Sequence, residues 1–187
     1  MNIRHVILDR DGVLNREAPA HGYILSVAEF QWLPGALDAL ALLHRAGLRL
    51  SVATNQSAVG RGLMDLARLE EILDHMRAAA DAAGGRLDAV YYCPHGPDQH
   101  CDCRKPRPGL LTAAIADSGI DAAHTLFAGD DVRDVEAALA AGITPVLLRT
   151  GKGRRAEEAL HARGLAIAVH DDLLQFAQAL TGAGARS

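Results

Sequence analysis

Residues 6–12 read VILDRDG, a short apolar run followed by two aspartates that are separated by one residue. The apolar run predicts a buried strand, and Gly12 would let the chain turn sharply after it. Outward from this stretch, apolar strands alternate with amphipathic helices along the whole chain. Such alternation predicts a parallel sheet covered on both faces and wound in both directions by right-handed crossovers. The expected fold class is therefore α/β, with a Rossmann-like, doubly wound parallel sheet.

The expected elements are short and separated by glycine, proline and polar turns. Strands are expected at 6–8, 48–54, 88–93, 125–130, 144–149 and 166–170. Helices are expected at 36–46, from Asp65 to Gly84, at 109–118, from near Asp134, and at 172–180. In the helix that Asp65 caps, the expected apolar stripe consists of Leu66, Leu69, Leu73, Met76 and Ala80.

Length and composition limit the class of protein. The chain has 187 residues, of which 49 % are hydrophobic and 22 % charged, which predicts one soluble globular domain over 1–187. A net charge of −4 and a pI near 6.1 argue against a protein that binds nucleic acid or a membrane surface. No apolar run approaches twenty residues, and Asp9 comes too early for a secretory signal. We therefore expect a cytoplasmic monomer.

Polar side chains follow four of the expected strands. Asp9 and Asp11 follow the first strand, residues 54–57 the second, residues 104–105 the loop after the third, and residues 130–131 the fourth. In doubly wound sheets, ligands bind at the carboxyl ends of the strands, near the switch in strand order. The sequence therefore predicts a site that collects these side chains at one edge of the sheet.

These residue types suit phosphoryl transfer. A carboxylate such as Asp9 can attack phosphorus, and a second carboxyl group, Asp11, could protonate the leaving oxygen and later activate water. Both carboxylates would repel Asp130 unless a cation neutralised them, and Mg²⁺ prefers such oxygen ligands. Thr54 and Lys105 could hold the phosphoryl oxygens. One such aspartate alone would more often be a cap or turn residue, but four strand ends together favour catalysis.

The segments ILDRDGVLN, ATNQS, CRKPRPG and AGDDVRD resemble the four motifs of haloacid-dehalogenase-superfamily phosphatases, over nearly the whole chain. Residues 21–23, 53–62 and 147–153, and the cysteine loop, are similar to those of the D-glycero-D-manno-heptose-1,7-bisphosphate phosphatases. A sister group, the histidinol-phosphate phosphatases, shares the DRDG opening and the cysteine loop. The resemblance implies a Mg²⁺-dependent phosphatase without a separate cap domain, whose partner is a small sugar bisphosphate or, alternatively, histidinol phosphate.

The resemblance also implies a role for individual residues. It makes Asp9 the nucleophile and Asp11 the general acid and base, and it places Mg²⁺ on Asp9, the Asp11 carbonyl and Asp130. Thr54 and Lys105 match the positions that bind the phosphoryl group. The positions that match the substrate pocket are His21, Gly22, Tyr23, Asn55, Gln56, Ser57 and Arg104.

Asp131 departs from the pattern, because relatives often carry a lysine or a small residue there. Its carboxylate could strengthen the metal and substrate site or could point to solvent, and the sequence leaves both open. Asp134, one turn further on, is expected to cap the helix and to contact a residue of the site.

All three cysteines lie in CPHGPDQHCDC, residues 93–103. Clustered thiols in a reducing compartment favour a metal over disulfides, and a thiol nucleophile would need its own histidine and acid partners. Three cysteines and one histidine would close a tetrahedral Zn²⁺ shell, which predicts a structural ion that positions Arg104 and Lys105. His100 competes for the histidine position, but the family pattern favours His95. The expected ligands are Cys93, His95, Cys101 and Cys103.

Two other classes of function remain open from the residues alone. A non-enzymatic phospho-receiver could use a strand-end aspartate, a threonine and a lysine on the same fold. A zinc-stabilised nucleic-acid module fits poorly, because the chain is acidic and only 4 % aromatic. The basic stretch at 151–155 could help to attract an anion, but a solvated surface loop is expected there.

Overall fold

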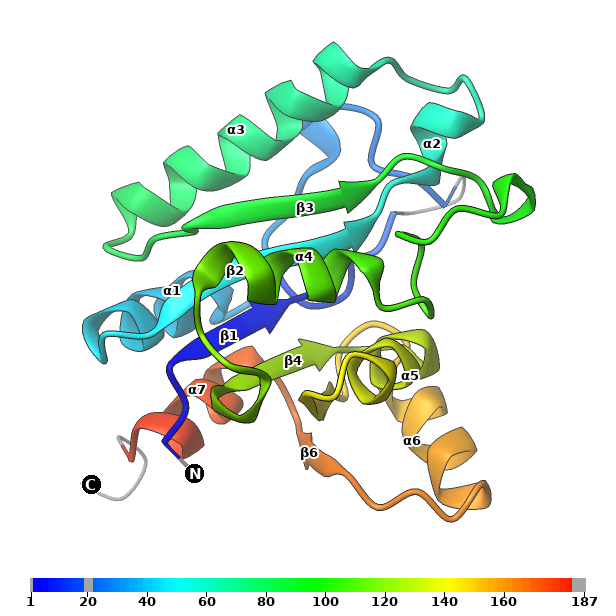
Figure 1. Cartoon of the computed structure of the whole chain (residues 1–187). Helices are drawn as coiled ribbons and strands as arrows, with labels where there is room; N and C mark the ends of the chain where they lie inside the picture. The colour runs from blue at the N-terminus through cyan, green and yellow to red at the C-terminus, as the bar shows by residue number, and fades with distance from the viewer. Residues whose placement is uncertain (1, 19–21, 183–187) are drawn as a thin grey trace.

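A computed structural model describes residues 2–18 and 22–182. Its strands are β1 (His5–Leu8), β2 (Arg49–Asn55), β3 (Ala89–Cys93), β4 (Thr125–Gly129), β5 (Thr144–Leu148) and β6 (Ala168–His170). They form one parallel sheet in the order β3-β2-β1-β4-β5-β6 (Figure 1), which confirms the doubly wound α/β class. The strand order switches between β1 and β4, so a crevice is expected beyond the ends of these two strands.

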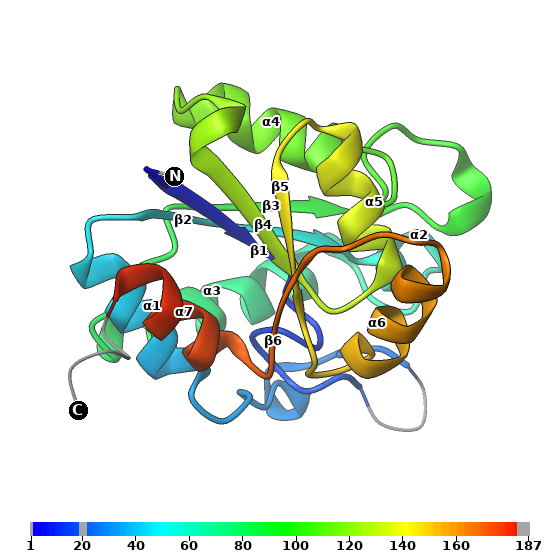
Figure 2. The same cartoon turned by 90° about the horizontal axis from the view of Figure 1, so that it is seen from below.

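Helices cover both faces of this sheet. They are α1 (Ala36–Arg45), α2 (Ser57–Gly60), α3 (Leu66–Ala82), α4 (Gly109–Ser118), α5 (Val132–Ala140), α6 (Gly153–Ala162) and α7 (Leu173–Thr181). Figure 2 shows α1, α3 and α7 on one side of the sheet and α4 and α5 on the other. The connection after β1 contains one 3-10 turn, η1 (Val27–Glu29), and the connection after β3 contains another, η2 (Pro97–Gln99). Among the described residues, neither connection carries a separate cap domain.

The core follows from the alternation of side chains along β1. Val6 and Leu8 are fully buried in the largest apolar cluster, which they share with residues of α1, α3 and α7. Ile7 points to the opposite face and packs in a second cluster with residues of α4 and α5. A strand that is buried on both faces is apolar at every position, which is why VIL predicted it.

Two expected helix features differ from the structure. Helix α5 begins at Val132 and not near Asp134, because the Asp131 side chain accepts the backbone N–H of Arg133 and is the N-cap. Residues 151–155, expected as a surface loop, run into the first turn of α6. Both differences lie at the amino ends of helices, where the start depends on a local hydrogen bond.

The apolar stripe of α3 also differs at one position. Leu66 is 50 % exposed, whereas Ile72 is fully buried and joins the core. Asp65 caps this helix as expected, since its side chain accepts the backbone N–H of Arg68. Across residues 2–18 and 22–182, we find no helix with the length and apolar content needed to cross a bilayer.

A buried histidine begins β1, at the end of the sheet opposite to the switch crevice. His5 is fully buried, and its Nε2 atom lies 2.9 Å from the Ser51 Oγ atom on β2. Burial, and next the positive charge of Arg49, lower the pKa of His5 to about 4, although Asp88 opposes this shift. The imidazole is therefore neutral in the folded protein at neutral pH.

Stability should fall as the pH is lowered from about 6.5 towards 4. In this window the unfolded chain binds a proton at His5 and the folded chain does not, so protonation favours unfolding. The test is the urea midpoint at pH 7 and at pH 4.5 for the wild type and His5→Gln, which keeps a donor for Ser51 but cannot titrate. The variant should show a clearly smaller loss of stability, and an equal loss would contradict the assignment.

Candidate active site

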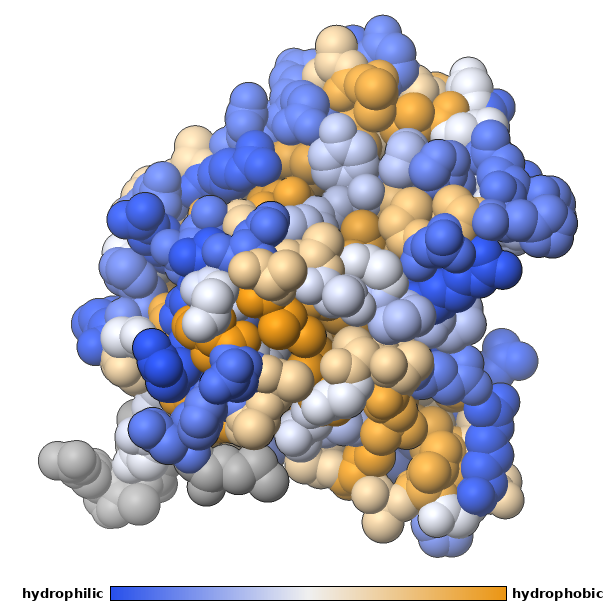
Figure 3. All heavy atoms as spheres, in the orientation of Figure 1, coloured by the Kyte–Doolittle hydropathy of each residue, from blue (hydrophilic) through white to orange (hydrophobic). Residues whose placement is uncertain are grey.

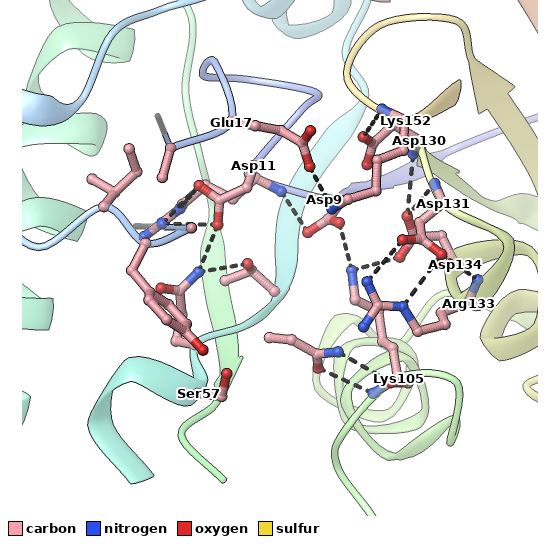
Figure 4. Close-up of a pocket in the computed structure, with 18 of the residues that line it drawn as sticks. Asp9, Asp11, Glu17, Ser57, Lys105, Asp130, Asp131, Arg133, Asp134 and Lys152 are labelled. Atoms are coloured by element: carbon pink, nitrogen blue, oxygen red, sulfur yellow. Dashed lines mark hydrogen bonds and ion pairs between the residues drawn. The ribbon is translucent and has the colours of Figure 1, made fainter. Parts of the chain in front are cut away.

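The carboxyl ends of five strands meet at one open cavity of about 380 Å³ (Figure 4). Nearly all the residues that the sequence singled out as catalytic or substrate-binding line it. They are Asp9, Asp11, Gly22, Tyr23, Thr54, Asn55, Gln56, Ser57, Arg104, Lys105, Asp130 and Asp131. His21 lies outside the described residues. The side chains that follow the strands thus lie around one cavity, as the rule for ligand sites at strand ends predicted.

A buried ion-pair network forms the floor of the cavity. Lys105 Nζ lies 2.9 Å from Asp9 Oδ2 and 2.7 Å from Asp134 Oδ1. Burial by itself would lower the pKa of Lys105, but the carboxylates of Asp134 and Asp9 raise it above its ordinary value, so the side chain stays an ammonium. Burial raises the pKa of Asp9 to about 7 in spite of Lys105, with Asp134 adding to the rise.

Three carboxylates converge beside this lysine. The side-chain oxygens of Asp9, Asp130 and Asp134 lie within 4.8 Å of one another. Burial, and then the charges of Asp9 and Asp134, raise the pKa of Asp130 to about 8. The cluster therefore holds more negative charge than one ammonium balances, and a hard cation fits it. The Asp11 carboxylate is not part of this cluster, and the ligand expected from that residue, its backbone carbonyl, stays a prediction.

Two glycines permit the chain to approach the Asp130 carboxylate. Gly12 has φ +85° and Gly151 has φ +52°, and a Cβ atom at either position would overlap the Asp130 carboxylate. The same carboxylate accepts the backbone N–H of Lys152 at 2.8 Å. The loops after β1 and β5 thus enclose Asp130 with backbone atoms, and a side chain at either glycine would displace it.

Asp11 faces a different set of partners. Arg10 Nη2 donates to both of its carboxylate oxygens, at 2.8 and 2.9 Å, and Asn15 Nδ2 donates at 2.9 Å. Gln56 Nε2 joins Asp11, at 3.0 Å, to Thr54 Oγ1, at 2.9 Å. Burial acts to raise the pKa of Asp11, but Arg10, and then Asn15 and Gln56, hold it below its ordinary value. The side chain is therefore a carboxylate in this arrangement.

Asp131 follows neither of the alternatives that the sequence left open. It caps α5 and forms an ion pair with Arg133, with Nη2 2.7 Å from Oδ2. It lines the cavity, but it lies outside the cluster of converging carboxylates. Asp134 takes part in capping α5 as the N3 residue of a capping box: its side chain accepts the backbone N–H of Asp131, the N-cap, at 3.0 Å, and that of Asp130 at 3.1 Å. Its contact with the site is confirmed, and this contact is the Lys105 ion pair.

The cysteine loop brings its four expected ligands together. Cys93 Sγ lies 3.5 Å from Cys101 Sγ and 3.1 Å from Cys103 Sγ, and His95 Nδ1 lies 3.3 Å from Cys103 Sγ. All four ligand atoms lie within 4.8 Å of one another. Tetrahedral Zn–S bonds of roughly 2.3 Å place sulfur atoms about 3.8 Å apart, so the four ligand atoms could hold Zn²⁺ if the sulfur atoms moved apart by a few tenths of an ångström. His100, the competing histidine, is not part of this cluster.

The same loop leads directly into the cations of the site. Arg104 Nη1 donates to the backbone carbonyl of His95 at 3.2 Å. The backbone of Lys105 exchanges two hydrogen bonds with the side chain of Asn55, each 3.1 Å long. The conformation of the loop on one side and the end of β2 on the other therefore fix where these two cations lie.

Four further charged residues of the cavity were not predicted as site residues: Arg10, Glu17, Arg133 and Lys152. Lys152 follows β5, and its ammonium forms an ion pair with Glu17. The rule that ligands bind at strand ends, applied to the fifth strand, would have found Lys152, although the sequence favoured a solvated loop there. No sequence signal places Glu17, because it lies in an irregular loop.

The fold and the site define the class of protein as a haloacid-dehalogenase-type phosphatase, a phosphoric monoester hydrolase. Residues 102–176 match the model of a family described as HAD-hyrolase-like. A D-glycero-beta-D-manno-heptose-1,7-bisphosphate 7-phosphatase from Pseudomonas putida is 48% identical over 153 residues, which are 82% of this chain and 86% of the relative. The enzyme of the same name from Pseudomonas aeruginosa is 43% identical over 94% of this chain and 96% of its own length. The chain belongs to the family of these 7-phosphatases.

A solved structure is similar over nearly its whole length. The D,D-heptose 1.7-bisphosphate phosphatase from B. bronchiseptica, crystallised with magnesium and phosphate, has a TM-score of 0.89 and 40% sequence identity. The match covers 97% of this chain and 99% of that chain. The similarity at this identity confirms the fold and agrees with a phosphatase that binds a cation and a phosphate.

A methyl group at Gly12 should abolish activity while the protein still folds. Gly12→Ala forces a left-handed backbone on alanine, at about 1 kcal/mol, and also displaces the Asp130 carboxylate. Gly84→Ala is the matched control, because Gly84 has φ +79° and no atom lies within 4 Å of the position that a methyl group would take there. Gly12→Ala should lose more stability in urea than Gly84→Ala, because it also displaces a buried carboxylate, and only Gly12→Ala should lose most of its phosphatase activity. Equal activity of the two variants would contradict this role of Gly12.

Proposed function

We propose that this chain hydrolyses the 7-phosphate of D-glycero-D-manno-heptose 1,7-bisphosphate through an aspartyl phosphate formed on Asp9. The observation that carries the proposal is the buried Asp9 carboxylate, which contacts Lys105 at the floor of a cavity in a chain of this family. The phospho-receiver alternative loses its support, because the relatives are named phosphatases.

Asp9 is oriented for attack on phosphorus. Its Oδ1 atom accepts the backbone N–H of Arg10 at 2.7 Å, and its Oδ2 atom contacts the ammonium of Lys105 at 2.9 Å. These contacts fix the carboxylate plane before the substrate arrives, so little reorganisation is needed in the transition state. Lys105 and the hydroxyl of Thr54 then lie where they can hold the phosphoryl oxygens. Attack breaks the bond from phosphorus to the sugar oxygen and leaves the phosphoryl group on Asp9.

Asp11 transfers protons in both half-reactions of this proposal. It gives a proton to the departing sugar oxygen and later takes one from the water that attacks the aspartyl phosphate. Its contacts with Arg10, Asn15 and Gln56 keep it ionised, which suits the second half-reaction. For the first half-reaction, the carboxyl group must release Arg10 and take up a proton.

Mg²⁺ fits the cluster of Asp9, Asp130 and Asp134. The raised pKa values of Asp9 and Asp130, to about 7 and about 8, report buried carboxylates that lack sufficient positive charge. A bound Mg²⁺ would supply that charge and polarise the phosphoryl oxygens. The proposed ligands are Asp9, the Asp11 carbonyl and Asp130, while Asp134 holds Lys105 beside them.

Zn²⁺ fits the four ligands of the cysteine loop and would be structural, because three cysteines and one histidine leave no open position. The proposal includes action in the cytoplasm. It further includes a monomer, a single phosphatase domain over 1–187, and a small-molecule substrate with no nucleic-acid partner.

The direct test is phosphate release from the heptose bisphosphate and from histidinol phosphate, with and without Mg²⁺. We expect a higher kcat/KM on the bisphosphate and loss of turnover without Mg²⁺. Asp9→Asn should fold normally, by circular dichroism, and lose activity by roughly three orders of magnitude or more, because the nucleophile is gone. A preference for histidinol phosphate would assign the substrate of the sister group, and near-full turnover of Asp9→Asn would exclude Asp9 as the nucleophile.

Loss of one zinc ligand should raise KM by a larger factor than it lowers kcat. Cys101→Ser should release Zn²⁺, lower the Tm and raise KM, while some turnover remains, because Arg104 depends on the His95 carbonyl for its position. The control is His100→Asn, since asparagine tolerates the left-handed backbone of His100, at φ 44°, and the residue lies outside the cluster. Zinc content, Tm and KM are measured together. Undiminished zinc content and substrate affinity in Cys101→Ser would refute the role of the loop.

A further inference from the structure

A second cavity adjoins the active site. It has a volume of about 280 Å³ and shares three lining residues with the active-site cavity: Arg104, Lys105 and Arg133. One of the shared residues, Lys105, also contacts the Asp9 carboxylate through its Nζ atom, so the second cavity and the proposed nucleophile have a neighbour in common. A substrate with two phosphate groups could therefore extend from one cavity into the other.

The two cavities differ in charge. The active-site cavity is lined by six carboxylates: Asp9, Asp11, Glu17, Asp130, Asp131 and Asp134. The described residues that line the second cavity include three arginines and one lysine, but no aspartate or glutamate. Figure 3 shows hydrophilic surface over the loop that follows β3, which forms part of this second cavity. Cations also line the active-site cavity, but its carboxylates outnumber them, so a phosphate that is not transferred would be attracted more strongly by the second lining than by the first.

Arg133 is held in a fixed orientation at the boundary between the cavities. Its Nε and Nη2 atoms contact the two carboxylate oxygens of Asp131, at 3.3 and 2.7 Å (Figure 4). This two-point contact uses one edge of the guanidinium, and the side chain remains 44 % exposed. The edge that carries Nη1 is therefore the one left for an anion. Holding an arginine in place before the ligand binds reduces the entropy that binding loses.

We infer that Arg133 is a specificity-determining residue, which binds the non-transferred phosphate together with Arg104 at the boundary of the two cavities. This inference rests on the proposed function, because it requires a substrate with a second phosphate. Arg133 would donate charge-assisted hydrogen bonds to that phosphate, and Arg104, which also lines both cavities, would add a second cation. Asp131, which lines the active-site cavity, would then act by orienting Arg133.

The test compares two substrates, the heptose 1,7-bisphosphate and heptose 7-phosphate, which lacks the second phosphate. For Arg133→Gln, kcat/KM on the bisphosphate should fall about tenfold or more, as expected for lost hydrogen bonds to a charged group, mostly through KM. On the monophosphate, kcat/KM should stay within about twofold. Arg163→Gln is the matched control, because Arg163 also pairs with a carboxylate of α5, Glu136, but lines neither cavity.

A double variant separates contact with the phosphate from neutralisation of Asp131. In Arg133→Gln alone, the unpaired Asp131 would repel an anion. In Asp131→Asn/Arg133→Gln this repulsion is gone, and asparagine is still a good N-cap, so α5 should remain folded. The ratio of kcat/KM on the bisphosphate to kcat/KM on the monophosphate should stay as low in the double variant as in Arg133→Gln. If the double variant recovers the wild-type ratio, the guanidinium only shields Asp131 and the inference is wrong.

The outcomes also distinguish this inference from the proposed function. If the wild type fails to release phosphate from the bisphosphate, the proposed function is wrong. Suppose instead that the wild type hydrolyses the bisphosphate. If kcat/KM of Arg133→Gln then falls by the same factor on both substrates, or falls on neither, the proposed function stands and the role of Arg133 is refuted.

Discussion

The contact of one buried ammonium with two buried carboxylates is the constraint on which the site depends. Lys105 is 2 % exposed and lies between Asp9 and Asp134, whose side chains are 12 % and 3 % exposed, so water compensates these charges only weakly. A buried charge without a partner costs several kcal/mol, roughly, and each partner here is therefore necessary to the others. The three residues lie in the segments that follow three different strands: Asp9 after β1, Lys105 after β3 and Asp134 after β4. The sheet must consequently be correctly assembled before the catalytic floor exists.

The position of Lys105 depends in turn on the cysteine loop. The loop contains little apolar surface of its own, and its ligand atoms converge on a point that Zn²⁺ fits. Arg104 reaches back to the His95 carbonyl, and the next residue, Lys105, is held on its other side by Asn55. A metal ion bound to the loop would therefore set the geometry of two cations of the cavity without taking part in the proposed chemistry. This arrangement would explain why the cluster directly precedes Lys105 in the sequence.

Features that depend on local patterns could be predicted from the sequence. Continuous apolar runs predicted the strands because the sheet is buried on both faces. The cysteine cluster predicted a metal site with three sulfur ligands, whereas the choice of His95 over His100 rested on the family resemblance. Membership of the cavity could be predicted for Asp9 and Asp130, since strand ends in a parallel sheet share one edge. Individual partners could not be predicted, because they depend on how loops cross that edge. The Lys105–Asp134 ion pair, and the pairing of Lys152 with Glu17, are contacts of this kind.

The division of charge between the two cavities bears on which phosphate of a bisphosphate reacts. In the active-site cavity, where carboxylates outnumber cations, a phosphate would bind favourably together with a metal ion, whereas the cations that line the neighbouring cavity would attract a phosphate without one. With no cap domain among the described residues to enclose the substrate, shape alone constrains its direction weakly. Electrostatics can supply the missing constraint. If the bisphosphate bound in the reverse direction, each of its two phosphates would lie in the surroundings of the other. Arg133 and its neighbours would then orient the substrate, and the buried contact of Lys105 with Asp9 would decide where it is cleaved.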